Sequence, residues 1–140
     1  MTRFFRPLCL SVLLVSTGFG MAAAQGKVPL AEEPHINAQL VAGAAGDILR
    51  NTCPSISARM FTVMAKLLEL EQYARDNGYT EDEVRPFLKD KDQKARVKAL
   101  AADYLAKAGA VAGDIESYCK VGRDEIAKAT LLGTLLKSSE

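Results

Sequence analysis

Apolar residues recur at helical spacing in most of the chain beyond its N-terminal quarter, and turn signals separate five such segments. The first segment runs from Ile36 or Asn37 to Thr52. Pro54 stops it, because a residue that precedes proline is pushed out of the helical region. Six apolar positions define one face of this helix: Ile36, Leu40, Val41, Ala44, Ala45 and Ile48. We therefore expect a first helix that ends beside Cys53.

The second segment is strongly apolar, and its pattern predicts the central core helix of the protein. It begins with a cap at Ser55 or Ser57 and ends at the stop signal Asn77-Gly78. Apolar side chains cover more than half of its circumference: Met60, Phe61, Val63, Met64, Leu67, Leu68, Leu70 and Ala74. We interpret the methionines as core residues that fill gaps rather than as a cofactor site.

A capping box predicts where the third helix begins. Thr80 and Glu83 have the spacing of this motif, and Tyr79 and Val84 stand where a hydrophobic staple closes over it. Pro86 lies too far along the segment for the first turn, where a missing backbone N–H is tolerated. The third helix is therefore predicted to be short, or kinked just before the proline.

Residues 92–108 predict a fourth helix with a clean apolar stripe, which Gly109 stops. Its opposite face contributes to a basic region between Arg85 and Lys98. The members of this region are Arg85, Lys89, Lys91, Lys94, Arg96 and Lys98. An acidic stretch from Glu69 to Glu83 precedes it. We favour two solvated charged faces here, and the alternative is a surface for an acidic partner.

The last segment extends from Asp114 or Ser117 to Leu136 and carries a strip of small residues on its apolar side. Small side chains let helices approach closely, so we predict a fifth helix that crosses the first one tightly. The crossing is expected to use six positions: Gly43, Ala44, Gly46, Gly122, Ala129 and Gly133. The alternative interpretation of these glycines is a hinge or a ligand notch.

No segment shows the alternation of a strand or a hairpin dipeptide, so the predicted class is all-α. We expect residues 36–138 to form one domain with one core and about four to five helices. Residues 25–35, with two prolines and a glycine, predict an extended leader. His35 is the only histidine, and we interpret it as a surface residue because a ligand or base needs rigid partners.

The N-terminus has the pattern of a secretory signal peptide. A short basic run ends at Pro7, the apolar stretch Leu8 to Val15 follows, and Ala22 and Ala24 frame a cleavage site. An uncleaved membrane anchor is the alternative, but a spanning helix needs about 20 apolar residues. We therefore predict that residues 1–24 are removed and that the mature protein lies in the periplasm without stable membrane insertion.

Cleavage changes the charge and the cysteine content. Of 18 basic residues, Arg3 and Arg6 leave with the signal, so 16 remain against 17 acidic residues. A nearly neutral chain has no electrostatic footprint for nucleic acid. Cys9 leaves as well, and the remaining Cys53 and Cys119 are expected to form a disulfide outside the cytosol. This bridge closes a loop of about 67 residues, which contributes roughly 4 kcal/mol in the chain-entropy model.

Several stretches together resemble a small family of exported bacterial proteins, domain of unknown function 5333. The stretches are Arg50-Asn-Thr-Cys53, Ser57-Ala-Arg-Met-Phe61, Ala74-Arg-Asp-Asn-Gly-Tyr-Thr-Glu-Asp-Glu83, Tyr118-Cys-Lys-Val-Gly122, Arg123-Asp-Glu-Ile-Ala127 and Gly133. They span nearly all of the mature chain. The resemblance implies a periplasmic helical domain and supplies no catalytic residues to transfer.

The residue inventory argues against an enzyme. The chain has no tryptophan, no Gly-rich phosphate loop and no His/Cys cluster, so we predict no catalytic residue, cofactor or metal. Two acidic pairs, Asp114 with Glu116 and Asp124 with Glu125, are better explained as charges on a helix surface. The two cysteines are too far apart in sequence for a redox C-x-x-C motif.

The leading functional hypothesis is a non-enzymatic periplasmic protein that binds another protein through a helical face. Narrower versions are an immunity or inhibitor protein for a toxin or hydrolase, and a holdase that responds to acid or stress. The hypothesis from a different class is a small-ligand-binding protein, with a pocket where the glycines of the first and last helices meet. The partner and the oligomeric state are open.

Overall fold

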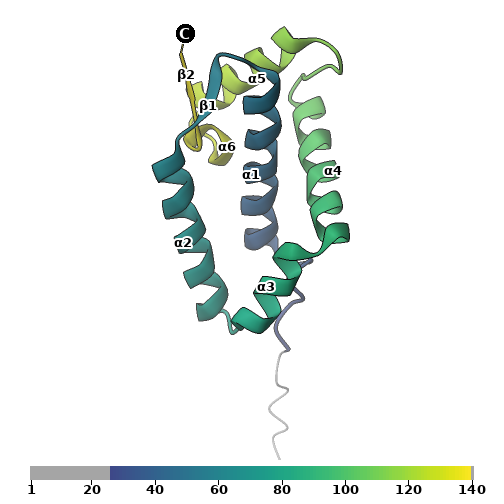
Figure 1. Ribbon diagram of the computed structural model, residues 1–140, viewed down its shortest axis with the longest axis vertical. Coiled ribbons are helices and arrows are strands. Elements are labelled where there is room, and N and C mark those ends of the chain that lie inside the picture. The colour runs from purple at the N-terminus through teal and green to yellow at the C-terminus, as the bar shows by residue number, and fades with distance from the viewer. Residues whose placement is uncertain (1–25, 140) are drawn as a thin grey trace, which may run out of the picture.

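Six helices and one small sheet form within residues 26–139, the part of the chain that the computed structural model describes (Figure 1). In chain order they are α1 (Pro34–Thr52), β1 (Ile56–Ala58), α2 (Met60–Asp76), α3 (Glu81–Lys89), α4 (Lys91–Lys107), α5 (Ile115–Ala127), α6 (Leu131–Thr134) and β2 (Leu136–Ser138). The predicted all-α class with one disulfide is confirmed. The predicted signal peptide lies outside the described residues.

The central helix of the fold is α1. Ala42, Ala45 and Leu49 are buried on it, and α4, α5, α6 and β1 all contact it. Because two of these side chains are single methyl groups, α4 can approach closely and bury Ala101 and Leu105 in the same core. In Figure 1, α1 runs down the middle of the molecule between α2 and α4.

The second helix is not the core helix that the sequence predicted. Only Ala74 is buried on α2, and Phe61 is 96% exposed. The helix is attached near its two ends, where Val63 packs on the main core and Ala74 joins a small cluster with Ile36 and Tyr79. The prediction was wrong because a helical repeat shows that one face is apolar, but not what covers that face.

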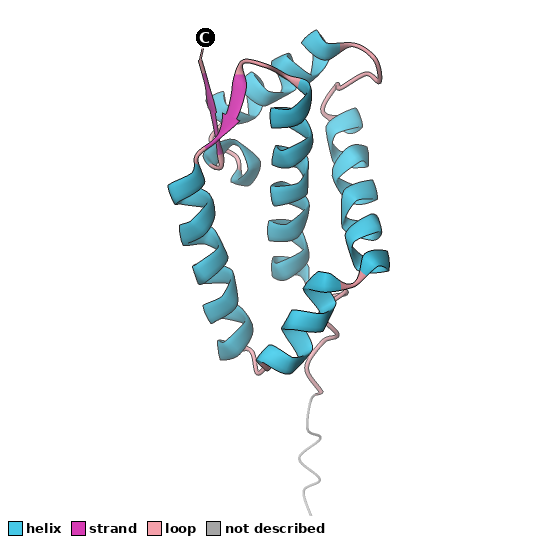
Figure 2. Ribbon diagram, viewed as in Figure 1, coloured by secondary structure: helices cyan, strands magenta, loops and turns pink. Residues whose placement is uncertain are grey.

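An unpredicted two-stranded antiparallel sheet joins the segment between α1 and α2 to the C-terminal segment (Figure 2). Ile56 pairs with Ser138 and Ala58 pairs with Leu136. The pairing occupies residues 56–58, so α2 begins at Met60 and not at a serine cap. Strands of three residues are too short to show a readable alternation.

The last predicted helix is broken into two helices and a strand. α5 ends at Ala127, and Ala129 adopts a left-handed turn with φ 48°. The Thr130 hydroxyl then accepts a hydrogen bond from the Gly133 N–H at 3.0 Å and caps α6. The reversal brings three leucines into the main core: Leu132, Leu135 and Leu136.

Local signals predicted the start of α3 and the ends of α2 and α4, but α1 begins earlier than predicted. Glu33 caps α1 by accepting from the Ile36 N–H at 2.5 Å, so the helix starts at Pro34 and includes His35, and the expected leader is two residues shorter. At α3, the Glu83 carboxylate accepts from the Thr80 N–H at 2.8 Å and from its hydroxyl at 3.0 Å. α3 is short and contains Pro86, as expected.

Candidate functional site

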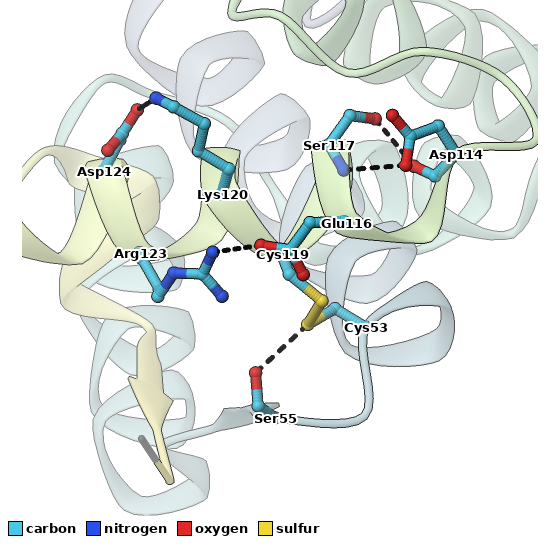
Figure 3. A network of polar contacts seen from close by, with 9 residues as sticks. All are labelled: Cys53, Ser55, Asp114, Glu116, Ser117, Cys119, Lys120, Arg123 and Asp124. Carbon is cyan, nitrogen blue, oxygen red and sulfur yellow. Dashed lines mark hydrogen bonds and ion pairs between the residues drawn. A yellow bond between two sulfur atoms is a disulfide. The ribbon is translucent and has the colours of Figure 1, made fainter.

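The disulfide between Cys53 and Cys119 joins the C-terminal end of α1 to α5 (Figure 3). The two Cα atoms lie 5.1 Å apart, and both cysteines are buried. The Ile56 N–H donates to the Cys53 carbonyl at 3.2 Å, so the bridge also fixes the start of β1. It therefore holds the sheet in position at the point where α2 begins.

The acidic pairs considered in the sequence have structural contacts around this bridge. Figure 3 shows Arg123 facing Glu116, and Lys120 in an ion pair with Asp124 at 2.6 Å. Asp114 caps α5 by accepting from the Ser117 N–H at 3.3 Å. Asp114, Glu116 and Asp124 belong to the outer surface of α5 and do not converge on a common point. Glu125 is buried, so the prediction of a surface charge was wrong for this residue.

Three of the glycines lie at close approaches, but not at the crossing that was predicted. A Cβ atom added at Gly122 would lie 2.9 Å from Cγ1 of Ile56 on β1, and one at Gly133 would lie 1.9 Å from the Glu125 carbonyl oxygen. At Gly46 the neighbours are Leu132 and Leu136. Gly122 thus allows close approach of β1, Gly133 allows close approach of α5, and Gly46 faces α6 and β2.

The remaining small residues confirm that the two strips do not meet. A Cβ at Gly43 would find nothing within 4 Å, Ala44 is half-buried, and Ala129 lies in the turn after α5. The expected crossing is therefore wrong, because Gly122 packs against β1 while Ala129 and Gly133 lie beyond the end of α5. The ligand pocket expected at this crossing stays a prediction, and of these residues Ala44 lines the cleft between α1, α3 and α4.

The basic region does not form one continuous patch. Arg85 is paired with Glu81 at 2.9 Å, and Arg96 donates to the Asn37 side chain at 2.7 Å. Lys94 lines a cleft of about 180 Å³ between α1, α3 and α4. The charges are thus divided between structural contacts and solvent.

Large apolar side chains are exposed along one helix. Besides Phe61, four residues of α2 are between 47% and 61% exposed. The α2 apolar face consists of Met60, Phe61, Met64, Leu67 and Leu68. A contiguous exposed apolar surface of this kind marks an interaction site in soluble proteins. Figure 1 shows α2 at the edge of the molecule, opposite α4.

Two clefts lie at the two ends of this face. The first has about 370 Å³ and adjoins Met60 and Phe61, with Arg59 and Lys137 at its rim. The second has about 250 Å³ and lies between the C-terminal half of α2 and α3. Its lining residues are Glu71, Ala74, Arg75, Tyr79, Thr80, Glu81, Val84, Arg85, Leu88 and Lys89. The apolar face therefore has a cleft near each of its two ends.

The sequence pattern predicted that these apolar residues lie in the core. One signal in the sequence distinguishes the two cases. Met60, Met64 and Leu67 continue at the same spacing to Glu71, which places a carboxylate in the apolar stripe. A charged residue within a stripe is a sign that the stripe is not fully buried.

Two buried carboxylates connect helices near the ends of the fold. Glu33 accepts from the Tyr73 hydroxyl at 2.9 Å, and Glu125 accepts from the Tyr104 hydroxyl at 2.9 Å. Burial opposes ionisation of Glu33, but hydrogen bonds from the Ile36 N–H, the Tyr73 hydroxyl and the backbone of His35 outweigh it and lower its pKa. Burial and the bond to Glu125 raise the pKa of Tyr104 to about 12.

Within residues 26–139, no group of three or more metal-ligating side chains is close enough to hold a metal ion. Across the same residues, no helix has both the length and the apolar content for a membrane span. His35 stacks on the Tyr73 ring, with 4.2 Å between the ring centroids. His35 itself is exposed, as predicted, so this contact lies at the surface between α1 and α2.

The sequence profile of a family described as "Family of unknown function (DUF5333)" matches residues 28–137. The chain belongs to this family. The match covers the helices from α1 to α6, so the resemblance drawn from the sequence is confirmed for the DUF5333 protein. Comparison with curated proteins and with solved structures found no match. The α2 apolar face is the main candidate for a functional site in this DUF5333 protein.

Proposed function

We propose that this DUF5333 protein is a non-enzymatic periplasmic protein that binds another protein through the α2 apolar face. The observation that carries the proposal is the exposure of five large apolar side chains on one helix, with Phe61 96% exposed. Aromatic residues and methionines are enriched in protein interfaces. Exposed Leu side chains beside them add apolar area without a desolvation penalty.

The energetics of the face suit association with a partner. Complete burial of a fully exposed Leu, Met or Phe side chain contributes about 1.5–3 kcal/mol. Because the five side chains are between 47% and 96% exposed, together they supply roughly 5–9 kcal/mol before the entropic cost of association. Phe61 is the most exposed member and borders a cleft. We expect it to be the residue whose truncation weakens binding most.

The contacts of the acidic side chains support a non-enzymatic role. The two buried carboxylates, Glu33 and Glu125, are occupied by hydroxyl and amide donors of the same domain. On the surface of α5, Glu116 and Asp124 are in ion pairs. These interactions explain the positions of the carboxylates through folding alone.

The disulfide supports the periplasmic part of the proposal, since such bridges persist in oxidising compartments. Fractionation of cells that express the full chain, followed by mass measurement, tests it. We expect a periplasmic species that begins at Gln25 and contains no free thiol. A cytoplasmic species with the first 24 residues attached would contradict export.

The binding role is tested by affinity capture from periplasmic extract. We expect the wild-type protein to capture a specific partner and Met64→Glu to lose it, because a buried carboxylate would oppose docking. Ile115→Glu is the matched control, since Ile115 is 56% exposed and lies on α5. Capture that Met64→Glu leaves intact would exclude the α2 face, and repeated capture of nothing specific would count against a protein-binding role.

An immunity or inhibitor role is the narrower version of the same proposal. In that case the captured partner is a toxin or hydrolase, and the α2 apolar face contributes to covering its active site. An activity assay of the captured enzyme with and without the protein tests this version. Unchanged activity in the complex would remove it.

The acid-responsive holdase has one observation in its favour. Glu33 links the N-terminal end of α1 to Tyr73 on α2, and protonation in acid would weaken this link beside the apolar face. Circular dichroism and light scattering at pH 3 test the idea. A fold that remains unchanged and monomeric at that pH would rule it out.

A further inference from the structure

The spacing of the apolar residues along α2 indicates the shape of a partner that would pack on them. Met60, Met64, Leu67, Glu71 and Ala74 follow one another at alternating steps of four and three residues. This is the 3.5-residue repeat along which two helices pack at a shallow crossing angle. The strip from Met60 to Ala74 is about 21 Å long, at a rise of about 1.5 Å per residue. Of the five residues named, the first four are exposed, whereas Ala74 is buried at the base of the second cleft. A partner helix of about four turns matches this length.

The two end clefts define where such a helix would be anchored. The cleft beside Met60 and Phe61 and the cleft beside Ala74 and Val84 lie at opposite ends of the strip. Grooves that bind an amphipathic helix hold large apolar anchors at both ends in this way. A second copy of α2 fits less well, because its apolar side chains occupy only residues 60–68. Aligned antiparallel about Met64, it leaves the second cleft empty.

The charges differ between the two ends. Among residues 26–139, no carboxylate forms an ion pair with Arg59 or Lys137, which border the first cleft. At the second cleft, Arg85 is paired with Glu81, and Arg75 lies 4.0 Å from Glu71. The first cleft therefore has two cations without an ion-paired carboxylate among these residues, and the second has three cations, Arg75, Arg85 and Lys89, against two carboxylates. Complementarity at an interface places opposite charges together.

We infer that the α2 apolar face binds an amphipathic helix of the partner protein, whose acidic residues lie at the end that contacts Arg59 and Lys137. The inference rests on the proposed function and names the partner's chemistry. The apolar stripe of this helix covers Met64 and Leu67. Its acidic end completes the ion pairs that the rim of the first cleft lacks.

Two designed peptides of four helical turns test the inference with the disulfide-bonded protein. Both carry leucines at 3.5-residue spacing, one with glutamates at one end and the other with lysines there. Fluorescence anisotropy is expected to give at least about tenfold tighter binding of the glutamate peptide, because the charges attract across the rim. The double variant Arg59→Glu/Lys137→Glu should reverse this preference. Lys98→Glu, on the outer surface of α4, is the control that should leave it unchanged.

The outcomes separate this inference from the proposed function. Equal affinity for the two peptides, or an effect of Lys98→Glu as large as that of the double variant, would overturn the charge assignment. If neither peptide binds while capture of a partner still depends on Met64, the helical occupant is wrong and the binding role stands. A concentration-dependent dimer that Met64→Glu dissociates would assign the face to a second copy. If neither peptide binding nor capture depends on Met64, both proposals fail.

Discussion

α1 and α2 are similar in length and apolar content but have opposite roles. α1 runs through the core with two buried alanines, whereas α2 keeps its methionines, leucines and Phe61 at the surface. Small side chains let five other elements contact α1. The comparison shows that in this protein the helix with the larger apolar side chains leaves most of them exposed to solvent.

Removal of the disulfide, which joins α1 to α5, is expected to have the largest effect on the free energy of unfolding. The double variant Cys53→Ser/Cys119→Ser should lower the free energy of unfolding by roughly 4 kcal/mol, through the longer free loop in the unfolded chain. Urea denaturation followed by circular dichroism measures the change. A loss below about 1 kcal/mol would mean that the packing around α1 is sufficient without the bridge.

A matched pair of leucines compares the two helices directly. Leu49→Ala on α1 should lower the free energy of unfolding by about 2–5 kcal/mol, since this side chain is fully buried. Leu68→Ala on α2 should change it by less than about 0.5 kcal/mol, because Leu68 is 61% exposed. Thermal and urea unfolding of both variants give the comparison. Equal losses would place α2 in the core after all.

A pair of glycines sharpens the comparison at the backbone. Gly133→Ala places a methyl group against the Glu125 carbonyl, so we expect a loss of about 1–3 kcal/mol as α6 shifts from α5. Gly43→Ala meets open space on α1 and should increase stability by about 0.5–1 kcal/mol, from helix propensity alone. Melting temperatures that move in opposite directions would agree with this. A loss of stability in Gly43→Ala would indicate that another element packs closely against α1 at this position.

The smallest expected effect concerns pH at the connection from α2 to α3. The hydrogen bond from Lys27 and then those from the Thr80 N–H and hydroxyl lower the pKa of Glu83 to about 2. A carboxyl whose pKa is lower in the folded state stabilises the fold above its ordinary pKa of 4.5, and this contribution is lost as pH falls toward about 2. Urea midpoints at a series of pH values should therefore decline less in Glu83→Gln. Identical declines in the two proteins would contradict the assignment.

Local chemistry explains which parts of the fold could be predicted from the sequence. Pro54 and Gly109 end helices through their own backbone restrictions, and Glu83 caps α3 with a side chain three residues away. The Cys53–Cys119 pair followed from setting Cys9 aside with the predicted signal peptide, which left two cysteines, and the disulfide confirms the pairing. None of these inferences depended on what lies on the far side of a helix.

The remaining features depend on distant contacts. The exposure of α2, and with it the candidate site, depends on which helix packs along α1, and in this fold it is α4 and not α2. A periodic pattern does not encode this choice of neighbour. The break after Ala127 depends on Leu132 finding space beside Gly46. Only Thr130, a good cap residue inside the expected helix, pointed to this break in the sequence.

The sulfur–sulfur bond also makes a covalent ring of residues 53–119, and the exposed α2 lies within this ring. A protease that cuts α2 once therefore opens the ring without releasing a fragment. The nicked chain would keep its full mass on a non-reducing gel and fall into two pieces only after treatment with a thiol. Cleavage of this exposed helix thus leaves the molecule in one piece.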